Sequence, residues 1–245
     1  MSLSEAQRNK IASYVRSYII RTAERHGHQN ATFRANARWM HTLNVRHNLM
    51  AILKGEKTPP DVRDVCEVAA FFHDVDHYTV QLEYHAERGA ETASRFLTKE
   101  GYAPEFVQRV AYIIREHNRD LEDDTPVEQQ VQQIISLLNL EARMVMDADT
   151  LDKIGASNIL QSVASMASSS NRPVAEAARE LTSGWPLQRA RLWKEMLTTA
   201  TGQKMGAQRF AFYERFLKQI ADEMVMDDPF PEIAQTQEMS ALTSS

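Results

Sequence analysis

The chain has 245 residues, of which 43% are hydrophobic and 25% are charged, and this suits one large globular domain or two small ones. Its net charge of −5 argues against an extended nucleic-acid surface, although a small basic pocket is compatible with it. The single cysteine excludes an internal disulfide, and without a signal-peptide pattern or an apolar run near the ~18 residues that span a bilayer, we expect a soluble cytoplasmic protein.

Helices are predicted along the whole chain. Glycine and proline are rare, with eight of each, and alternating β-branched runs are almost absent. Asp61 is expected to cap the third helix. The predicted helices cover approximately residues 4–24, 32–53, 61–74, 85–99, 104–117, 126–152, 156–167, 174–181, 187–197 and 208–224.

These elements predict one all-α domain, a helical bundle. An N-terminal helix within residues 1–30 packs on a core formed by residues 31–160. Residues 161–230 are expected to form a C-terminal helical extension of the same domain. The Ser-, Thr- and Gln-rich end, residues 231–245, is predicted to be disordered.

A dispersed set of histidines and aspartates is the main functional signal. It consists of His41, the adjacent pair His73 and Asp74, and Asp149. The pair ends the apolar run 68–72, and such polar groups are costly to bury without a partner. Imidazole nitrogens and carboxylate oxygens together suit a divalent metal ion. The set therefore predicts a metal site if the four side chains converge.

Helical periodicity tests which candidates face the core. Asp149 lies four residues after Val145 and continues an apolar stripe, so it is predicted to point inward. Asp152 stays near the same face. Asp147 falls roughly opposite and is expected to be solvated.

Two more histidines, His85 and His117, share a face with apolar residues of their own predicted helices. Gly89 and Ala90 would let the helix that follows His85 approach another helix closely. A single histidine on an apolar stripe is more often part of a packed core than a ligand. Several inward positions together with an adjacent His-Asp pair favour the metal site.

The ordered pattern resembles the HD superfamily of metal-dependent phosphohydrolases, whose signature is a His, an adjacent His-Asp and a distant Asp. The resemblance covers about residues 30–160. Three sequence segments support it: Ala69 to Val75, His85 to Ala90 and Ile113 to His117. The stretch Asp147 to Gly155 is similar to the final motif of the family. Val75-Asp76-His77 departs from the commoner Ile-Gly-x, and the Gly-Tyr-Pro extension of the cyclic-dinucleotide branch is missing.

The resemblance implies an HD-type core with His41, His73, Asp74 and Asp149 as metal ligands. This donor set suits Mn²⁺, Fe²⁺, Co²⁺ or Ni²⁺, with Mg²⁺ and Zn²⁺ as alternatives. Asp74 could also orient the attacking water.

A general acid must protonate the leaving oxygen, and three histidines are candidates: His77, His85 and His117. His85 or His117 could instead complete a second metal site.

Cationic side chains are expected to contact the phosphate. Arg34 and Arg38 share the face of His41, and Lys153 lies four residues after Asp149. Each could equally be a solvated surface charge.

We therefore predict hydrolysis of a phosphate ester or anhydride of a small molecule, preferably a nucleotide, by metal-activated water. The alternative is a non-catalytic nucleotide-binding or regulatory helical module with a structural metal site. No membrane partner is expected, and a homo-oligomer is compatible with the sequence.

Overall fold

The structure is a computed structural model that describes residues 3–27, 30–79, 81–117, 125–170 and 174–224. Within these residues every regular element is a helix, which confirms the predicted all-α fold. The helices are α1 (Glu5–Arg25), α2 (Ala31–Gly55), α3 (Pro60–Phe72), the short 3-10 helix η1 (Leu82–Tyr84), α4 (His85–Lys99), α5 (Pro104–Glu116), α6 (Val127–Leu137), α7 (Leu140–Asp152), α8 (Ala156–Ser170), α9 (Val174–Thr182), α10 (Trp185–Glu195) and α11 (Ala200–Glu223).

Local capping explains several helix starts. Ser4 and Gln7 form a reciprocal capping box at the start of α1. The expectation that Asp61 caps the third helix is wrong, because α3 begins one residue earlier, at Pro60, and Pro59 is its N-cap residue. Proline suits the first helical turn, where its missing N–H costs no hydrogen bond. Asp61 lies in the first turn, where its negative charge interacts favourably with the positive end of the helix dipole.

The single helix expected over residues 126–152 is two helices, α6 and α7. Leu138 is extended, and the Asn139 side chain accepts a hydrogen bond from the Ala142 N–H at 2.9 Å. This N-cap begins a new helix, so α7 is not a continuation of α6. The apolar stripe is interrupted accordingly: Ile134 is buried, whereas Ile135 is 39% exposed.

The last described helix is longer than predicted. It begins at Ala200 rather than near residue 208, because Thr199 caps it by accepting a hydrogen bond from the Gly202 N–H. The predicted disordered tail, residues 231–245, lies outside the described residues. No helix in the described part of the chain has the length and apolar character needed to cross a membrane.

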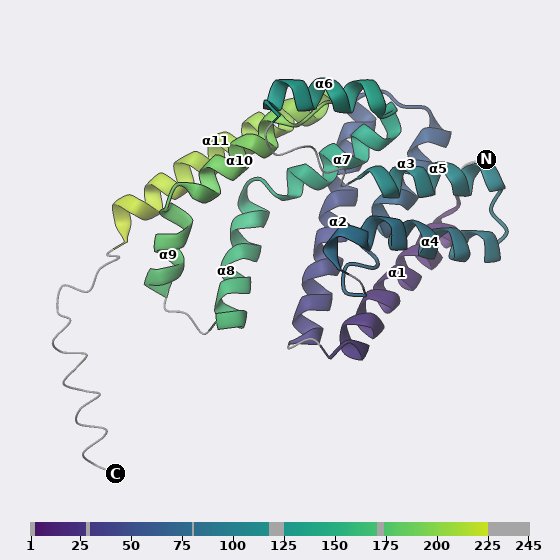
Figure 1. Cartoon of the computed structure of the whole chain (residues 1–245), viewed down its shortest axis with the longest axis horizontal. Helices are drawn as coiled ribbons and strands as arrows, with labels where there is room; N and C mark the ends of the chain where they lie inside the picture. Colours follow the sequence, from purple (N-terminus) through teal and green to yellow (C-terminus); the bar gives the residue numbers. More distant parts are fainter. Residues whose placement is uncertain (1–2, 28–29, 80, 118–124, 171–173, 225–245) are drawn as a thin grey trace, which may run out of the picture.

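Helix α2 runs through the middle of the molecule (Figure 1) and packs against α1, α3, α7 and α11. Helices α3, α4 and α5 lie on one side of it, and α8 to α11 on the other. One hydrophobic cluster is formed mainly by residues of helices α1 to α7. A second cluster is formed by Ile154 and residues of helices α8 to α11. The predicted boundaries between N-terminal helix, core and extension remain predictions.

Candidate metal centre

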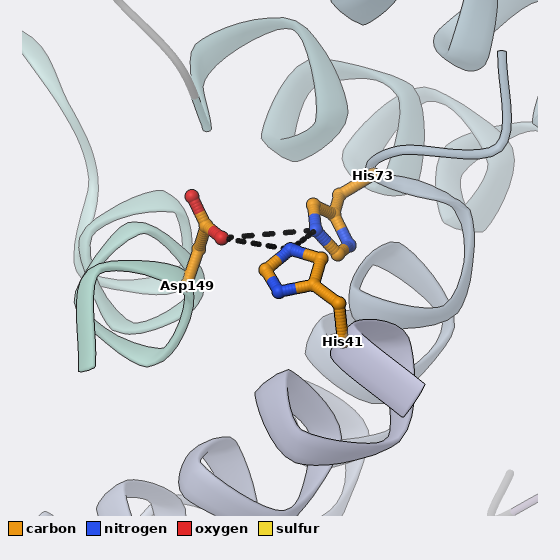
Figure 2. A group of neighbouring side chains, drawn as sticks. All are labelled: His41, His73 and Asp149. Atoms are coloured by element: carbon orange, nitrogen blue, oxygen red, sulfur yellow. Dashed lines mark hydrogen bonds and ion pairs between the residues drawn. The ribbon is translucent and has the colours of Figure 1, made fainter. Parts of the chain in front are cut away.

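Three of the predicted ligands meet where α2, the end of α3 and α7 come together (Figure 2). The Nε2 atom of His41 lies 3.1 Å from Nε2 of His73 and 3.1 Å from Oδ1 of Asp149. The His73 Nε2 and Asp149 Oδ1 atoms are 3.9 Å apart. Neighbouring ligands held at about 2.1 Å from one octahedral ion are about 3 Å apart, so these distances suit a shared ion.

The His73 ring is oriented by its own helix. Its Nδ1–H donates to the Ala70 carbonyl oxygen at 2.8 Å, which leaves Nε2 free to bind a metal. Burial lowers the pKa of His73 to about 3, so the ring is neutral, the form that a ligand requires.

Asp74 lies between two groups of histidines. Its Oδ2 atom is 3.4 Å from His41 Nε2 and 3.5 Å from His73 Nε2. Its Oδ1 atom is 3.2 Å from His85 Nε2 and 3.6 Å from His117 Nε2. The chain therefore offers two adjoining clusters of donor atoms. One consists of His41, His73 and Asp149, and the other of Asp74, His85 and His117.

His85 and His117 are both buried, as the helix faces predicted. Their Nε2 atoms lie 3.3 Å apart, and His117 Nδ1–H donates to the Ile114 carbonyl oxygen at 2.6 Å. Helix α4 approaches the end of α3 closely at Gly89, where an added Cβ would lie 3.3 Å from the Phe72 carbonyl oxygen. The predicted role of this glycine in close packing is confirmed.

The donor set fits a divalent cation. Within the described residues, buried Asp149 Oδ1 has no hydrogen bond of ordinary geometry, although His41 Nε2 is nearby. Burial lowers the pKa of His41, but the nearby carboxylates of Asp149, Asp152 and Asp74 outweigh it and raise the pKa to about 10. The carboxylates therefore favour a positive charge at this point, which a metal ion would supply.

Both aspartates of the predicted ligand set, Asp74 and Asp149, are ionised. Burial alone would raise their pKa values, but the charges of neighbouring cations outweigh it. The Arg38 guanidinium holds the pKa of Asp74 well below its usual range. Lys153 and His41 do the same for Asp149. Carboxylates that stay ionised when buried are ready ligands for a hard cation.

Two of the three predicted phosphate-binding cations reach the site. The Arg38 guanidinium is in direct contact with Asp74 Oδ2, and Lys153 Nζ lies 2.8 Å from Asp149 Oδ2. Arg34 is exposed, and its carbonyl oxygen accepts a hydrogen bond from the Tyr78 hydroxyl group at 2.9 Å. His77 lies at the rim, with Nδ1 4.0 Å from Asp74 Oδ1.

Asp152 contacts His41 on the side of the ring away from His73 and Asp149. The sequence predicted only that Asp152 lies near the same helix face as Asp149. His41 Nδ1–H donates to Asp152 Oδ2 at 2.8 Å. Gln161 of α8 donates weakly to the same oxygen at 3.4 Å. In the sequence, Asp152 lies three residues after Asp149, and this spacing places both carboxylates on one side of α7.

Asp76, where this chain departs from the usual motif, anchors the segment after Asp74. It is buried and accepts hydrogen bonds from the hydroxyl groups of Tyr18, Thr79 and Thr92. These donors come from α1, the segment itself and α4. The carboxylate thereby fixes the chain that carries Asp74 and His77.

The prediction that Asp147 is solvated is wrong, because it is 1% exposed. It accepts hydrogen bonds from the backbone N–H groups of Thr198 and Thr199, at 3.0 and 2.7 Å, and from both hydroxyl groups. The face of α7 opposite Asp149 is covered by the segment that begins α11. Asp147 therefore joins α7 to the C-terminal helices.

Residues 38–154 match the family model of the HD domain. Among solved structures, a predicted HD superfamily hydrolase from an uncultured Thermotogales bacterium is 23% identical, with 88% of this chain and 91% of that chain covered and a TM-score of 0.56. YpgQ of Bacillus subtilis in complex with ADP is 20% identical, with coverage of 89% and 96% and a TM-score of 0.56.

An HD-superfamily hydrolase from Bacillus thuringiensis is 17% identical, with coverage of 88% and 97% and a TM-score of 0.57. At these identities the solved structures share the fold. No curated protein matches the sequence.

Proposed function

The chain belongs to the HD superfamily, and on this basis we propose that it is a metal-dependent phosphohydrolase. Its substrate in this proposal is a small phosphate ester or anhydride, specifically a nucleotide. One observation carries the proposal. The ordered residues of the family signature, far apart in the sequence, present their donor atoms to one buried point between α2, α3 and α7.

His41, His73, Asp74 and Asp149 would hold the ion. Two imidazoles and two carboxylates suit Mn²⁺, Fe²⁺, Co²⁺ or Ni²⁺, with Mg²⁺ and Zn²⁺ as weaker fits. The bound ion would lower the pKa of a water molecule and neutralise charge on the phosphoryl group. Asp74 faces both donor clusters, so its carboxylate is suited to orient the attacking water.

Arg38 and Lys153 are suited to bind the phosphate. Each already contacts a ligand carboxylate, Asp74 and Asp149 respectively, so both cationic groups lie at the edge of the site. A phosphate that displaced part of either contact would receive charge-assisted hydrogen bonds. Arg34 is exposed, and its contact with the phosphate stays a prediction.

The proton for the leaving oxygen would come from one of His77, His85 and His117. His77 is the most exposed of the three side chains, at 24%. Burial and the charge of Arg38 lower the pKa of His77 to about 4, and a phosphate anion nearby would raise it again. If His85 and His117 hold a second ion with Asp74, His77 alone remains as the acid.

The choice of a nucleotide is supported by the structural neighbour YpgQ, which was crystallised in complex with ADP. The test is phosphate release from a panel of nucleoside mono-, di- and triphosphates, with sugar phosphates as non-nucleotide substrates. Wild type should release phosphate from at least one nucleotide. Asp74→Ala should lose at least 100-fold in kcat/KM, on the order of 3 kcal/mol of transition-state stabilisation.

Asp222→Ala is the matched control, because Asp222 is an exposed aspartate of α11. It should retain full activity. Unchanged activity in Asp74→Ala would rule out the proposed site, whereas activity on sugar phosphates alone would overturn only the nucleotide assignment.

A further inference from the structure

A pocket of about 370 Å³ lies between α2, α11 and the junction of α7 with α8. This volume is in the range of small-molecule sites. Most of the accessible wall is apolar and includes one aromatic ring, Phe212, at 39% exposure. Polar side chains that line it include Asn44, His47, Asp152, Ser157, Gln208 and Arg209.

The pocket is separate from the metal centre. Asp152 lines it and accepts the hydrogen bond from His41 Nδ1. The opposite nitrogen of the same ring, Nε2, faces His73 and Asp149. The His41 ring and the Asp152 carboxylate therefore stand between the pocket and the donor atoms of the metal centre.

Arg209 brings a positive charge to this wall without a matching acid. Its two terminal nitrogens donate to the Leu151 carbonyl oxygen and to Asn48 Oδ1, both at 2.6 Å. These acceptors are neutral, and across the described ranges no carboxylate forms an ion pair with Arg209. A guanidinium has five N–H groups, so donors remain for a ligand.

Asp152, the acid that shares the pocket, attracts the Arg209 guanidinium, but within the described residues the two form no ion pair. Asp152 already accepts hydrogen bonds from His41 and Gln161. Burial lowers the pKa of Arg209, and the charge of Asp152 offsets this only in part. A partly buried cation of this kind is stabilised by an anion that enters the pocket.

Further neutral polar groups line the same pocket as Arg209. Gln208 and His47 are exposed at the mouth of the pocket, and the first turn of α8, at Ala156 and Ser157, forms part of the wall. Amide groups in a first helical turn have no partner within the helix. Phe212 could cover an apolar part of the ligand.

We propose that this pocket binds the anionic group of a small molecule, a carboxylate or a phosphate, against Arg209, at a site distinct from the metal centre. The proposal does not depend on the hydrolase activity, because none of the residues that carry it is a predicted metal ligand.

The test is a residue-resolved NMR titration of the full-length, metal-free protein. Inorganic phosphate and succinate are added separately, so that the two anion classes are distinguished. We expect saturable shifts of the backbone amides of residues 155–157 and 207–212 with at least one anion. Shifts confined to residues 73–77, or no saturation with either anion, would overturn the proposal.

Charge variants sharpen the test. Gln208→Glu adds a negative charge at the exposed mouth and should weaken anion binding by about threefold to tenfold. Ala207→Glu adds the same charge at an exposed neighbour that does not line the pocket, and should change affinity by less than about twofold. Equal effects of the two variants would indicate non-specific attraction and contradict the site.

Arg209→Gln should abolish saturable binding. Because Arg209 also joins α11 to α2 and α7, its folding is checked from the spread of amide signals. Gln208→Glu decides the question if Arg209→Gln does not fold.

Discussion

The Asp152 carboxylate receives the Nδ1–H of His41 at 2.8 Å, and this hydrogen bond determines which nitrogen of His41 faces the metal site. A histidine ligand held in this way keeps one tautomer and one ring plane, and the carboxylate increases the basicity of the ligating nitrogen. In the proposed site, Asp152 would act on the metal through His41.

Asp152→Asn should weaken metal binding by about 10-fold to 100-fold, because the amide keeps the shape of the side chain but removes its charge. The affinity for Mn²⁺ or Co²⁺ is measured by competition with a chromophoric chelator. Asp147→Asn is the matched control, since Asp147 is buried on the same helix but contacts Thr198 and Thr199 instead of a ligand. Equal metal affinity in wild type and Asp152→Asn would contradict the positioning role.

Asp147→Ala should lower the free energy of unfolding by about 2–4 kcal/mol, because two backbone N–H groups and two hydroxyl groups lose their shared acceptor. Urea unfolding followed by circular dichroism measures the loss. Asp222→Ala, at an exposed position of α11, should remain within about 0.5 kcal/mol of wild type. A similar loss in both variants would show that Asp147 has no special role in joining α7 to α11.

Asp76→Ala should reduce both stability and activity. Three hydroxyl groups lose their acceptor, which we expect to cost about 1–3 kcal/mol, and the segment that carries Asp74 and His77 loses its anchor. Thermal unfolding and phosphate release are measured on the same preparation. Glu83→Ala, at an exposed position of the nearby η1, serves as the control. Full activity in Asp76→Ala would contradict the anchoring role.

Gly89→Val should weaken metal binding as well as the fold. The Cβ alone would lie 3.3 Å from the Phe72 carbonyl oxygen and 3.4 Å from that of His73, so two further methyl groups force α4 away from the end of α3. We expect about 1–3 kcal/mol of destabilisation. Ala86→Val introduces the same side chain at a partly exposed position of the same helix and should cost less. Urea unfolding measures both losses. A larger destabilisation by Ala86→Val than by Gly89→Val would contradict the close packing of α4 on the end of α3.

Helical periodicity was sufficient to place Asp149, because its position depends only on the regular turn from Val145 within α7. The same reasoning failed for Asp147. Its partners, Thr198 and Thr199, are about fifty residues further along the chain, and a stripe on one helix does not reveal what covers the opposite face.

The break between α6 and α7 had a local signal, Asn139 as an N-cap, but the apolar stripe on both sides of it favoured one helix. Asp76 is different again: its three donors come partly from α1 and α4, so its role appears only once these helices are packed.

Metal reconstitution tests the central claim most directly. The full-length protein is stripped of metal by a chelator, dialysed and titrated with Mn²⁺ while phosphate release from the preferred nucleotide is followed. Release should be absent without metal, rise in proportion to the bound ion, and stay near background in Asp149→Asn at every metal concentration. Phosphate release that is independent of metal, or that Asp149→Asn retains in full, would contradict the account.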